Sequence, residues 1–140
     1  MKKSLYVDAN VFIVAGVYPQ ESPEFKAAKK LLYAVSSGEA EAATSLLTWD
    51  ELVWVVRRMA GNEAAAEEGK RFLEIPNMKF LGVTENIIRK AQNITERYNL
   101  KPRDAIHTAS AIVNNAGSIV SDDADFDAVR GLKRIALERA

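Results

Sequence analysis

The fold of this chain is decided by the stretch Ser4-Leu-Tyr-Val-Asp8-Ala-Asn10. It predicts a short buried strand that ends in a carboxylate, with an amide two residues later. In open α/β sheets ligands gather at the carboxyl ends of parallel strands, so an acid at this place is typical of a functional site. The stretch Ser118-Ile-Val-Ser121-Asp122-Asp123-Ala-Asp125-Phe126 repeats the pattern near the other end of the chain. If both strands lie in one sheet, we expect their acids to meet in space.

Length and composition narrow the class of protein. The chain has 140 residues, of which 48% are hydrophobic and 27% charged, which predicts one domain over residues 1–140 with a hydrophobic core. There is no cysteine, so disulfides and thiolate metal sites are excluded, and a metal would need oxygen ligands or the single histidine, His107. The formal net charge is zero, which neither indicates nor excludes a nucleic-acid partner.

The sequence gives no sign of a membrane protein. Its purely apolar runs, such as the five residues from Leu52 to Val56, are far too short to cross a bilayer. The first residues, Met-Lys-Lys, resemble the start of a signal peptide, but Asp8 interrupts the chain before an apolar region can form. We therefore expect a cytoplasmic protein with no membrane partner.

Helix signals alternate with short strands. Ser22-Pro23-Glu24 is typical of a helix start, and Gly38 is typical of the end of that helix. Further patterns predict helices over residues 47–59, 62–76, 84–98 and 102–115, and strands over residues 41–43, 79–83, 119–120 and 134–137. Such alternation favours βαβ units and a small parallel sheet covered on both faces, the α/β class.

The helix over residues 47–59 has more apolar surface than one core contact needs. Its expected core stripe consists of Trp49, Leu52, Val53, Val56 and Met59. Trp54 and Val55 are also apolar but lie off this stripe, which suggests a second packing partner such as another subunit. Periodicity leaves open whether Asp50 or Glu51 faces a pocket.

Acids stand where elements begin or end. They are Asp8, the pair Asp50 and Glu51, Asp104, and the group Asp122, Asp123, Asp125 and Asp127. The helix N-terminus should keep Asp104 ionised at neutral pH. Two carboxylates about 4 Å apart repel by about 4 kcal/mol at an effective dielectric near 20, so a cluster of them needs protons or a divalent cation. Oxygen ligands favour Mg²⁺ or Mn²⁺ over zinc, and such a site predicts phosphodiester or phosphomonoester hydrolysis.

Four motifs follow one another in a familiar order. They are the strand ending in Asp8-x-Asn10, the helical Thr48-Trp-Asp-Glu51-Leu-Val, the helix start Arg103-Asp104-Ala-Ile-His107-x-Ala109, and Ser121-x-Asp123-x-Asp125-Phe126. In this order, and in its length, the chain resembles the PIN domain, and within that family it is most similar to the VapC-type toxins of type II toxin–antitoxin pairs. The resemblance implies a three-layer α/β/α sandwich with a small, mostly parallel sheet, and a Mg²⁺- or Mn²⁺-dependent endoribonuclease.

The resemblance also implies roles for individual residues. The implied catalytic acids are Asp8, Glu51, Asp104 and Asp123. Three of them, Asp8, Asp104 and Asp123, would hold the metal, and Glu51 would hold water or a second ion. The implied ligand- and water-positioning residues are Asn10, Ser121 and Asp125. Asp122 leaves open which acid of the adjacent pair faces the metal, and the role of His107 is open.

The resemblance implies partners as well. Family toxins act on RNA and are held inactive by a cognate antitoxin whose tail occupies the acidic groove, and they are commonly homodimers, which would suit the surface at Trp54. Two alternatives remain. One is a PIN-like module with an impaired site that binds RNA or protein. The other is a phosphatase of the haloacid dehalogenase type, whose first strand also ends in Asp-x-Asp, although this chain has Asn10 at the second place.

Overall fold

The computed structural model describes residues 4–140, so the Met-Lys-Lys start, with its expected resemblance to a signal peptide, lies outside the described residues. The elements in chain order are β1 (Ser4–Val7), α1 (Ala9–Val17), α2 (Pro23–Ser36), β2 (Glu41–Ser45), α3 (Leu47–Ala60), α4 (Asn62–Leu73), β3 (Met78–Leu81), α5 (Glu85–Arg97), α6 (Pro102–Val113), β4 (Ser118–Val120), the 3₁₀ turn η1 (Ala124–Ala128), β5 (Lys133–Ile135) and the 3₁₀ turn η2 (Leu137–Arg139). Among the described residues, no helix has the length and apolar character needed to span a bilayer.

The strands form one sheet in the order β3-β2-β1-β4-β5, and every pairing between neighbours is parallel. β1 lies at the centre, where Tyr6 pairs with Ala43 of β2 and with Ile119 of β4. The expectation that the first strand and the strand at residues 119–120 share a sheet is therefore confirmed. Because all the strands run the same way, the residues that follow β1, β2 and β4 lie along one edge of the sheet.

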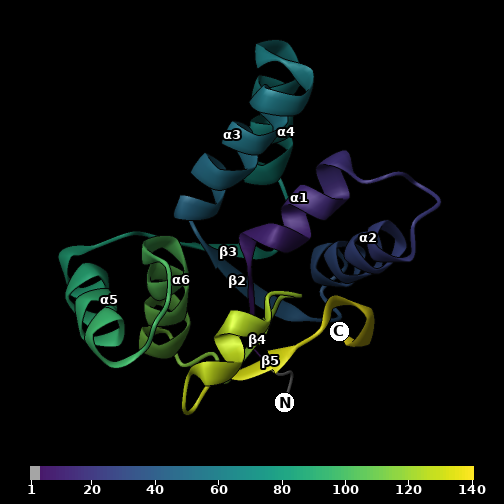
Figure 1. Cartoon of the computed structure of the whole chain (residues 1–140). Helices are drawn as coiled ribbons and strands as arrows, with labels where there is room; N and C mark the ends of the chain where they lie inside the picture. Colours follow the sequence, from purple (N-terminus) through teal and green to yellow (C-terminus); the bar gives the residue numbers. More distant parts are fainter. Residues whose placement is uncertain (1–3) are drawn as a thin grey trace.

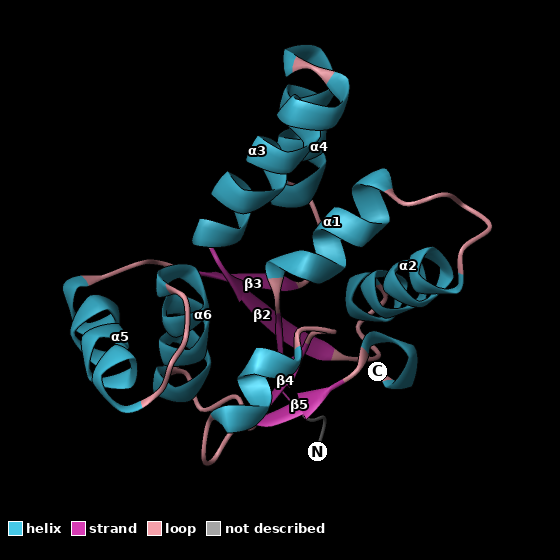
Figure 2. Cartoon of the chain, viewed as in Figure 1, coloured by secondary structure: helices cyan, strands magenta, loops and turns pink. Residues whose placement is uncertain are grey.

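Helices cover both faces of the sheet, which confirms the three-layer α/β/α arrangement (Figure 1). Successive residues of a strand point to opposite faces, and β1 shows this directly. Tyr6 is buried in a core built with α5, α6 and η1, whereas Val7 is buried in a second core built with α1, α2, α3 and α4. Figure 2 shows α5 and α6 on one side of the strands and α1 and α2 on the other.

The helix α1 was not predicted from the sequence. Its residues Ala9 to Val17 are all apolar apart from Asn10, so they show no helical period, and their valines and isoleucine favour a strand. The structure forms a helix here because Asp8 caps its N-terminus, accepting a hydrogen bond from the Ala9 N–H. The last predicted strand, over residues 134–137, is also shorter than expected, because Leu137 begins η2.

The helices α3 and α4 pack against each other and project away from the sheet (Figure 1). The expected core stripe of α3 holds for Leu52 and Val56, which are buried, but is wrong for Trp49 and Met59, which are 42% and 64% exposed. The projection explains the exposure of Met59, which lies in the last turn of α3, whereas Trp49 in the first turn lies beside Gly69 of α4. Gly69 of α4 permits the packing, because a Cβ there would lie 2.7 Å from Trp49 Nε1.

Candidate metal centre

Asp8 lies at the centre of the sheet edge, between β1 and α1. The residue is 5% exposed, and its carboxylate accepts two hydrogen bonds. Oδ1 accepts the Ala9 N–H at 2.9 Å, and Oδ2 accepts the Ser121 hydroxyl at 2.8 Å. The Asp8 N–H donates to the Val120 carbonyl, which fixes the end of β1 against the end of β4. The carboxylate therefore stands on a rigid strand-to-helix junction.

Ser121 connects Asp8 to the acidic loop that follows β4. Its hydroxyl donates to Asp8 and accepts the Asp123 N–H at 3.0 Å. The Asp123 carboxylate in turn accepts the Asp125 N–H at 2.9 Å, which caps η1. The buried Ser121 hydroxyl therefore holds the Asp8 carboxylate close to the backbone of Asp123.

The structure brings the expected acids into two neighbouring groups, close enough for the charges of Asp8 and Glu51 to act on Asp104. In one, a side-chain oxygen of Asp8, one of Glu51 and a ring nitrogen of His107 lie within 4.8 Å of one another. In the other, carboxylate oxygens of Asp104, Asp123 and Asp125 lie within 4.8 Å of one another. Asp104 and His107 stand one turn apart at the N-terminal end of α6, so this helix contributes to both groups.

The choice between Asp50 and Glu51 is settled by the direction of α3. The Glu51 side chain is 14% exposed and points to His107, whose Nε2 lies 3.1 Å from Oε2. The Asp50 side chain is 56% exposed and faces Arg103 at 3.6 Å. Glu51 is therefore the helical acid that reaches the cluster, while Asp50 lies on the surface.

Two further acids near η1, Asp122 and Asp127, point away from the cluster. The Asp122 carboxylate accepts the Leu137 N–H at 2.8 Å, so it points toward η2, and Asp123 is the member of the adjacent pair that joins the cluster. Asn10 ties the same loop to α1, because its Oδ1 accepts the Asp122 N–H at 3.3 Å. Asp127 pairs with Arg134, which holds the pKa of this exposed carboxyl below its usual range.

Burial and neighbouring charges shift the pKa values of the clustered acids. Burial raises the pKa of Asp8, and the nearby Glu51 adds to this, although His107 and the Ser121 hydroxyl act in the other direction. Burial and the charges of Asp8 and Asp123 raise the pKa of Asp104 to about 6. These neighbours outweigh the effect of the helix N-terminus on the pKa, although a carboxyl with a pKa of about 6 is still mostly ionised at neutral pH, as the sequence predicted.

His107 and Tyr6 lie behind the acids, and both are fully buried. Burial lowers the pKa of His107, but the hydrogen bond to Glu51 and the charges of Asp8 and Glu51 outweigh it, so the pKa is raised. Tyr6 Oη lies 2.6 Å from His107 Nδ1. Sequence reasoning left His107 open and assigned Tyr6 only to a strand. Tyr6 stands two residues before Asp8 on the same side of β1, which is the signal that could have found it.

The donor set suits a hard divalent cation. Within the described residues the cluster offers mainly carboxylate oxygens, the ligands that Mg²⁺ and Mn²⁺ prefer, beside one imidazole. Burial raises the pKa of both Asp8 and Asp104, and the charges of Asp8 and Asp123 add to the shift of Asp104, so a nearby cation would stabilise the ionised carboxylates. The residues present therefore fit such an ion.

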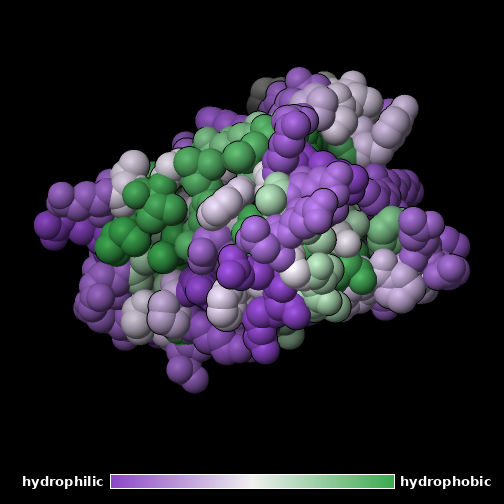
Figure 3. All heavy atoms as spheres, turned by 90° about the horizontal axis from the view of Figure 1, so that it is seen from above, coloured by the Kyte–Doolittle hydropathy of each residue, from purple (hydrophilic) through white to green (hydrophobic). Residues whose placement is uncertain are grey.

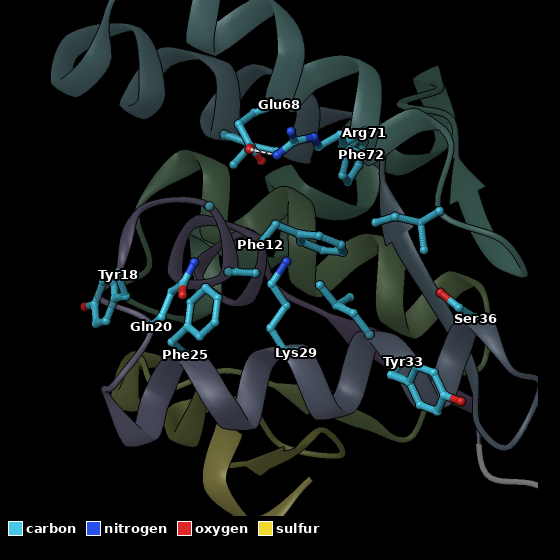
Figure 4. Close-up of a pocket in the computed structure, with 15 residues that line it drawn as sticks. Phe12, Tyr18, Gln20, Phe25, Lys29, Tyr33, Ser36, Glu68, Arg71 and Phe72 are labelled. Carbon is cyan, nitrogen blue, oxygen red and sulfur yellow. Dashed lines mark hydrogen bonds and ion pairs between the residues drawn. The ribbon is translucent and has the colours of Figure 1, made fainter.

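Two grooves lie on the surface around the sheet edge. One, of about 580 Å³, opens beside the cluster and is lined by Ile13, Glu51, Trp54, Val55, Lys101, Pro102, Arg103, Asp104 and Asp123. The other, of about 620 Å³, lies between α1, α2 and α4. Figure 4 shows Phe12, Lys29 and the ion pair of Glu68 with Arg71 facing this second groove. None of the clustered acids lines it, so it is separate from the candidate metal centre.

Comparison with known proteins places the chain in a family. The model of the PIN domain matches residues 5–132. The structure is similar to VapBC2 from Rickettsia felis, solved with a DNA fragment from its promoter, with a TM-score of 0.74, 14% identity and coverage of 95% of this chain and 98% of that chain. It is also similar to VapC20 from Mycobacterium tuberculosis, a toxin that cleaves the sarcin–ricin loop, with a TM-score of 0.71, 20% identity and coverage of 89% and 93%.

A toxin–antitoxin complex from Klebsiella pneumoniae is similar as well, with a TM-score of 0.67, 19% identity and coverage of 91% of this chain and 94% of that chain. No curated protein sequence matches the chain. The likeness to these solved structures shows the fold, and the match over residues 5–132 covers most of the sequence. This protein therefore belongs to the PIN domain family.

Proposed function

We propose that this protein is an endoribonuclease that depends on Mg²⁺ or Mn²⁺ and acts in the cytoplasm as the toxin of a type II toxin–antitoxin pair. The observation that carries the proposal is the convergence of Asp8, Glu51, Asp104 and Asp123 at one edge of the sheet. These acids come from four separate parts of the chain, and each of them would be more stable apart. Membership of the PIN domain family supports the same activity.

Each residue has a distinct task in the proposed reaction. Asp8, Asp104 and Asp123 would hold the cation, because Asp104 lies close enough to both of the others to feel their charges, and Glu51 would hold a water molecule bound to that cation. When bound, the cation supplies charge neutralisation, activates water for in-line attack and stabilises the leaving oxygen. Ser121 keeps Asp8 and Asp123 at a fixed separation through its two hydrogen bonds. Asn10 and Asp125 hold the loop that carries Asp123.

The groove beside the cluster supports single-stranded RNA as the substrate. Lys101 and Arg103 line it close to Asp104, and cationic side chains there can bind the phosphates that flank the cleaved bond. Ile13 and Pro102 add an apolar wall to this groove. Unpaired bases can pack on such apolar side chains, whereas bases within a duplex cannot reach them.

A cognate antitoxin is the proposed regulatory partner. The similar structures include toxin–antitoxin complexes, and the groove between α1, α2 and α4 offers a second surface away from the acids. Its lining includes the aromatic rings of Phe12 and Phe72, and Lys29 extends from α2 into it (Figure 4). We propose that an apolar antitoxin segment binds here, while a basic side chain of its tail reaches the acids.

This assignment of the second groove can be tested with the product of the adjacent reading frame. Tyr33 lines the groove and is 72% exposed, so Tyr33→Asp should leave the fold intact and weaken co-purification with that product. Lys90→Asp on α5, far from the groove in sequence and outside its lining, is the control. Unchanged co-purification of Tyr33→Asp would remove the groove as the antitoxin site.

Homodimer formation is proposed from exposed hydrophobic surface. Viewed from above, the molecule carries a continuous band of hydrophobic residues beside more hydrophilic areas (Figure 3). Trp54 on α3 is exposed, as are Leu46 and Met59 of the same region. A second copy of the chain packing on α3 would bury these side chains.

The nuclease proposal is tested with purified protein and a structured RNA that contains unpaired loops. We expect cleavage in Mg²⁺ or Mn²⁺, none in EDTA, and loss of cleavage in Asp8→Asn and Asp104→Asn. Asp50→Asn is a matched control, because Asp50 is a surface acid beside Glu51 on the same helix. Hydrolysis of a small phosphomonoester without RNA cleavage would favour a phosphatase, and RNA binding without any hydrolysis would favour an impaired binding module.

A further inference from the structure

A buried line of hydrogen bonds connects the sheet to Glu51. The Ser45 N–H donates to Tyr6 Oη over 3.0 Å. Tyr6 Oη lies 2.6 Å from His107 Nδ1, and the two rings make an edge contact with centroids 5.7 Å apart. On its other side His107 Nε2 lies 3.1 Å and 3.2 Å from the two Glu51 oxygens. The line runs from β2 through β1 and α6 to Glu51 on α3.

The surroundings of His107 determine where its protons lie. Nε2 faces both oxygens of Glu51 and is 3.7 Å from Asp8 Oδ1. A lone pair on Nε2 would point at these negative oxygens, so Nε2 carries a proton and donates to Glu51. Nδ1 then accepts the Tyr6 hydroxyl proton when the ring is neutral, or donates to Tyr6 Oη when it is charged. Glu51 receives a hydrogen bond from Nε2 in either charge state.

Tyr6 is the anchor of this line. The Tyr6 phenol can donate its proton to a neutral His107, because Tyr6 Oη lies 2.6 Å from Nδ1. Its oxygen accepts the N–H of Ser45, the last residue of β2, which lies beyond the pairing of β2 with β1, and this bond fixes the hydroxyl relative to the sheet. Without the hydroxyl, the Ser45 N–H would lose a buried acceptor and His107 would lose the contact that selects its protonated nitrogen.

We infer that Tyr6 and His107 are positioning residues that hold the Glu51 carboxylate at the cation site and keep a ring nitrogen from ligating the cation. The inference rests on the proposed function, because it assigns Glu51 to that site. Glu51 needs such support, since α3 projects from the sheet and its carboxylate stands next to the negative charge of Asp8. Partners of this kind, one step behind the ligands, commonly contribute ten- to a hundred-fold to metal affinity.

Mn²⁺ binding, followed by electron paramagnetic resonance, tests the inference without relying on RNA cleavage. We expect His107→Leu to weaken Mn²⁺ binding about ten- to a hundred-fold, and Tyr6→Phe to weaken it less. His107→Gln should recover part of the affinity, because its amide N–H can still donate to Glu51. Thr108→Val is the matched control, as Thr108 is the buried neighbour of His107 on α6 and its hydroxyl has no hydrogen-bond partner among the described residues.

The same spectra report on ligation. We expect bound Mn²⁺ to show no hyperfine coupling to a directly bound nitrogen, and a coupling that disappears in His107→Gln would overturn the inference. Affinities of Tyr6→Phe and His107→Gln equal to that of the original protein would also overturn it, even if His107→Leu does not fold. Asp104→Asn separates the two proposals: if it also binds Mn²⁺ normally, the proposed cation site itself is wrong.

Discussion

Replacing Asp104 with Asn should stabilise the metal-free protein at pH 7.5. Asp104 has an ordinary pKa of 3.8, and burial together with the charges of Asp8 and Asp123 raises its pKa to about 6 in the folded state. The folded protein therefore binds this proton more tightly than the unfolded chain. Stability falls as the pH rises from 3.8 to about 6 and stays reduced above that window. Asn carries no charge, so it removes this loss.

The size of the effect follows from the same values. A tenfold change in acidity is worth about 1.4 kcal/mol, so the difference between 3.8 and about 6 sets a ceiling of about 3 kcal/mol. Asp104 is partly exposed, and solvent screening lowers this to roughly half. The charged carboxylate also gains a few tenths of a kcal/mol from the N-terminus of α6, which Asn forgoes. We expect a net gain of about 1 kcal/mol in the free energy of unfolding.

Urea denaturation in EDTA at pH 5 and pH 7.5 measures this gain. We expect about half of it to disappear at pH 5, because Asp104 is then largely protonated in the folded state. Mg²⁺ should shrink or reverse the difference, since it binds the original protein more tightly than the variant. Asp50→Asn, on the exposed side of α3, should change stability by less than about 0.5 kcal/mol. A metal-free Asp104→Asn that is less stable at pH 7.5, or a gain that does not change with pH, would refute the reasoning.

Three further changes test other parts of the structure. Ser121→Ala removes the hydroxyl that bonds Asp8 and the Asp123 N–H, and should cost about 1–3 kcal/mol of unfolding free energy in urea titrations. Trp54→Asp should shift the mass measured by light scattering toward a monomer, and an unchanged mass would exclude this surface as the dimer interface. Phe72→Ala should cost about 3–5 kcal/mol by the same titration, because its ring is buried between Phe12 and Phe80.

The sheet and its edge could be predicted because they follow from local signals. A buried run that ends in Asp8, and another that ends before Asp123, place both acids at strand ends whatever the details of packing. The parallel arrangement then brings the strand ends together. The first turn of α6 was equally clear, since Pro102 fixes the helix start and Asp104 must lie near it.

Other parts depend on tertiary contacts that no local pattern contains. The apolar run of α1 is surrounded by other helices and the sheet, so the amphipathic period that reveals a helix is missing. The choice of Glu51 over Asp50 depends on how α3 leaves the sheet, which the period of the helix cannot give. The contact between Tyr6 and His107 joins residues 101 positions apart and became visible only in the structure.

The clustered acids lie on elements that differ in how firmly the fold holds them. Asp8 lies between a central strand and a buried helix, and Asp104 stands on α6, whose inner face belongs to the core. Asp123 instead lies on a loop that Ser121 and a single turn of η1 hold in place. Repulsion among the carboxylates displaces the least constrained segment most, which is the loop that carries Asp123. A cation should therefore contribute more to the order of this loop than to that of either helix. If the proposed function is right, the core fixes Asp8 and Asp104 in advance, and Asp123 would complete the site when an ion binds.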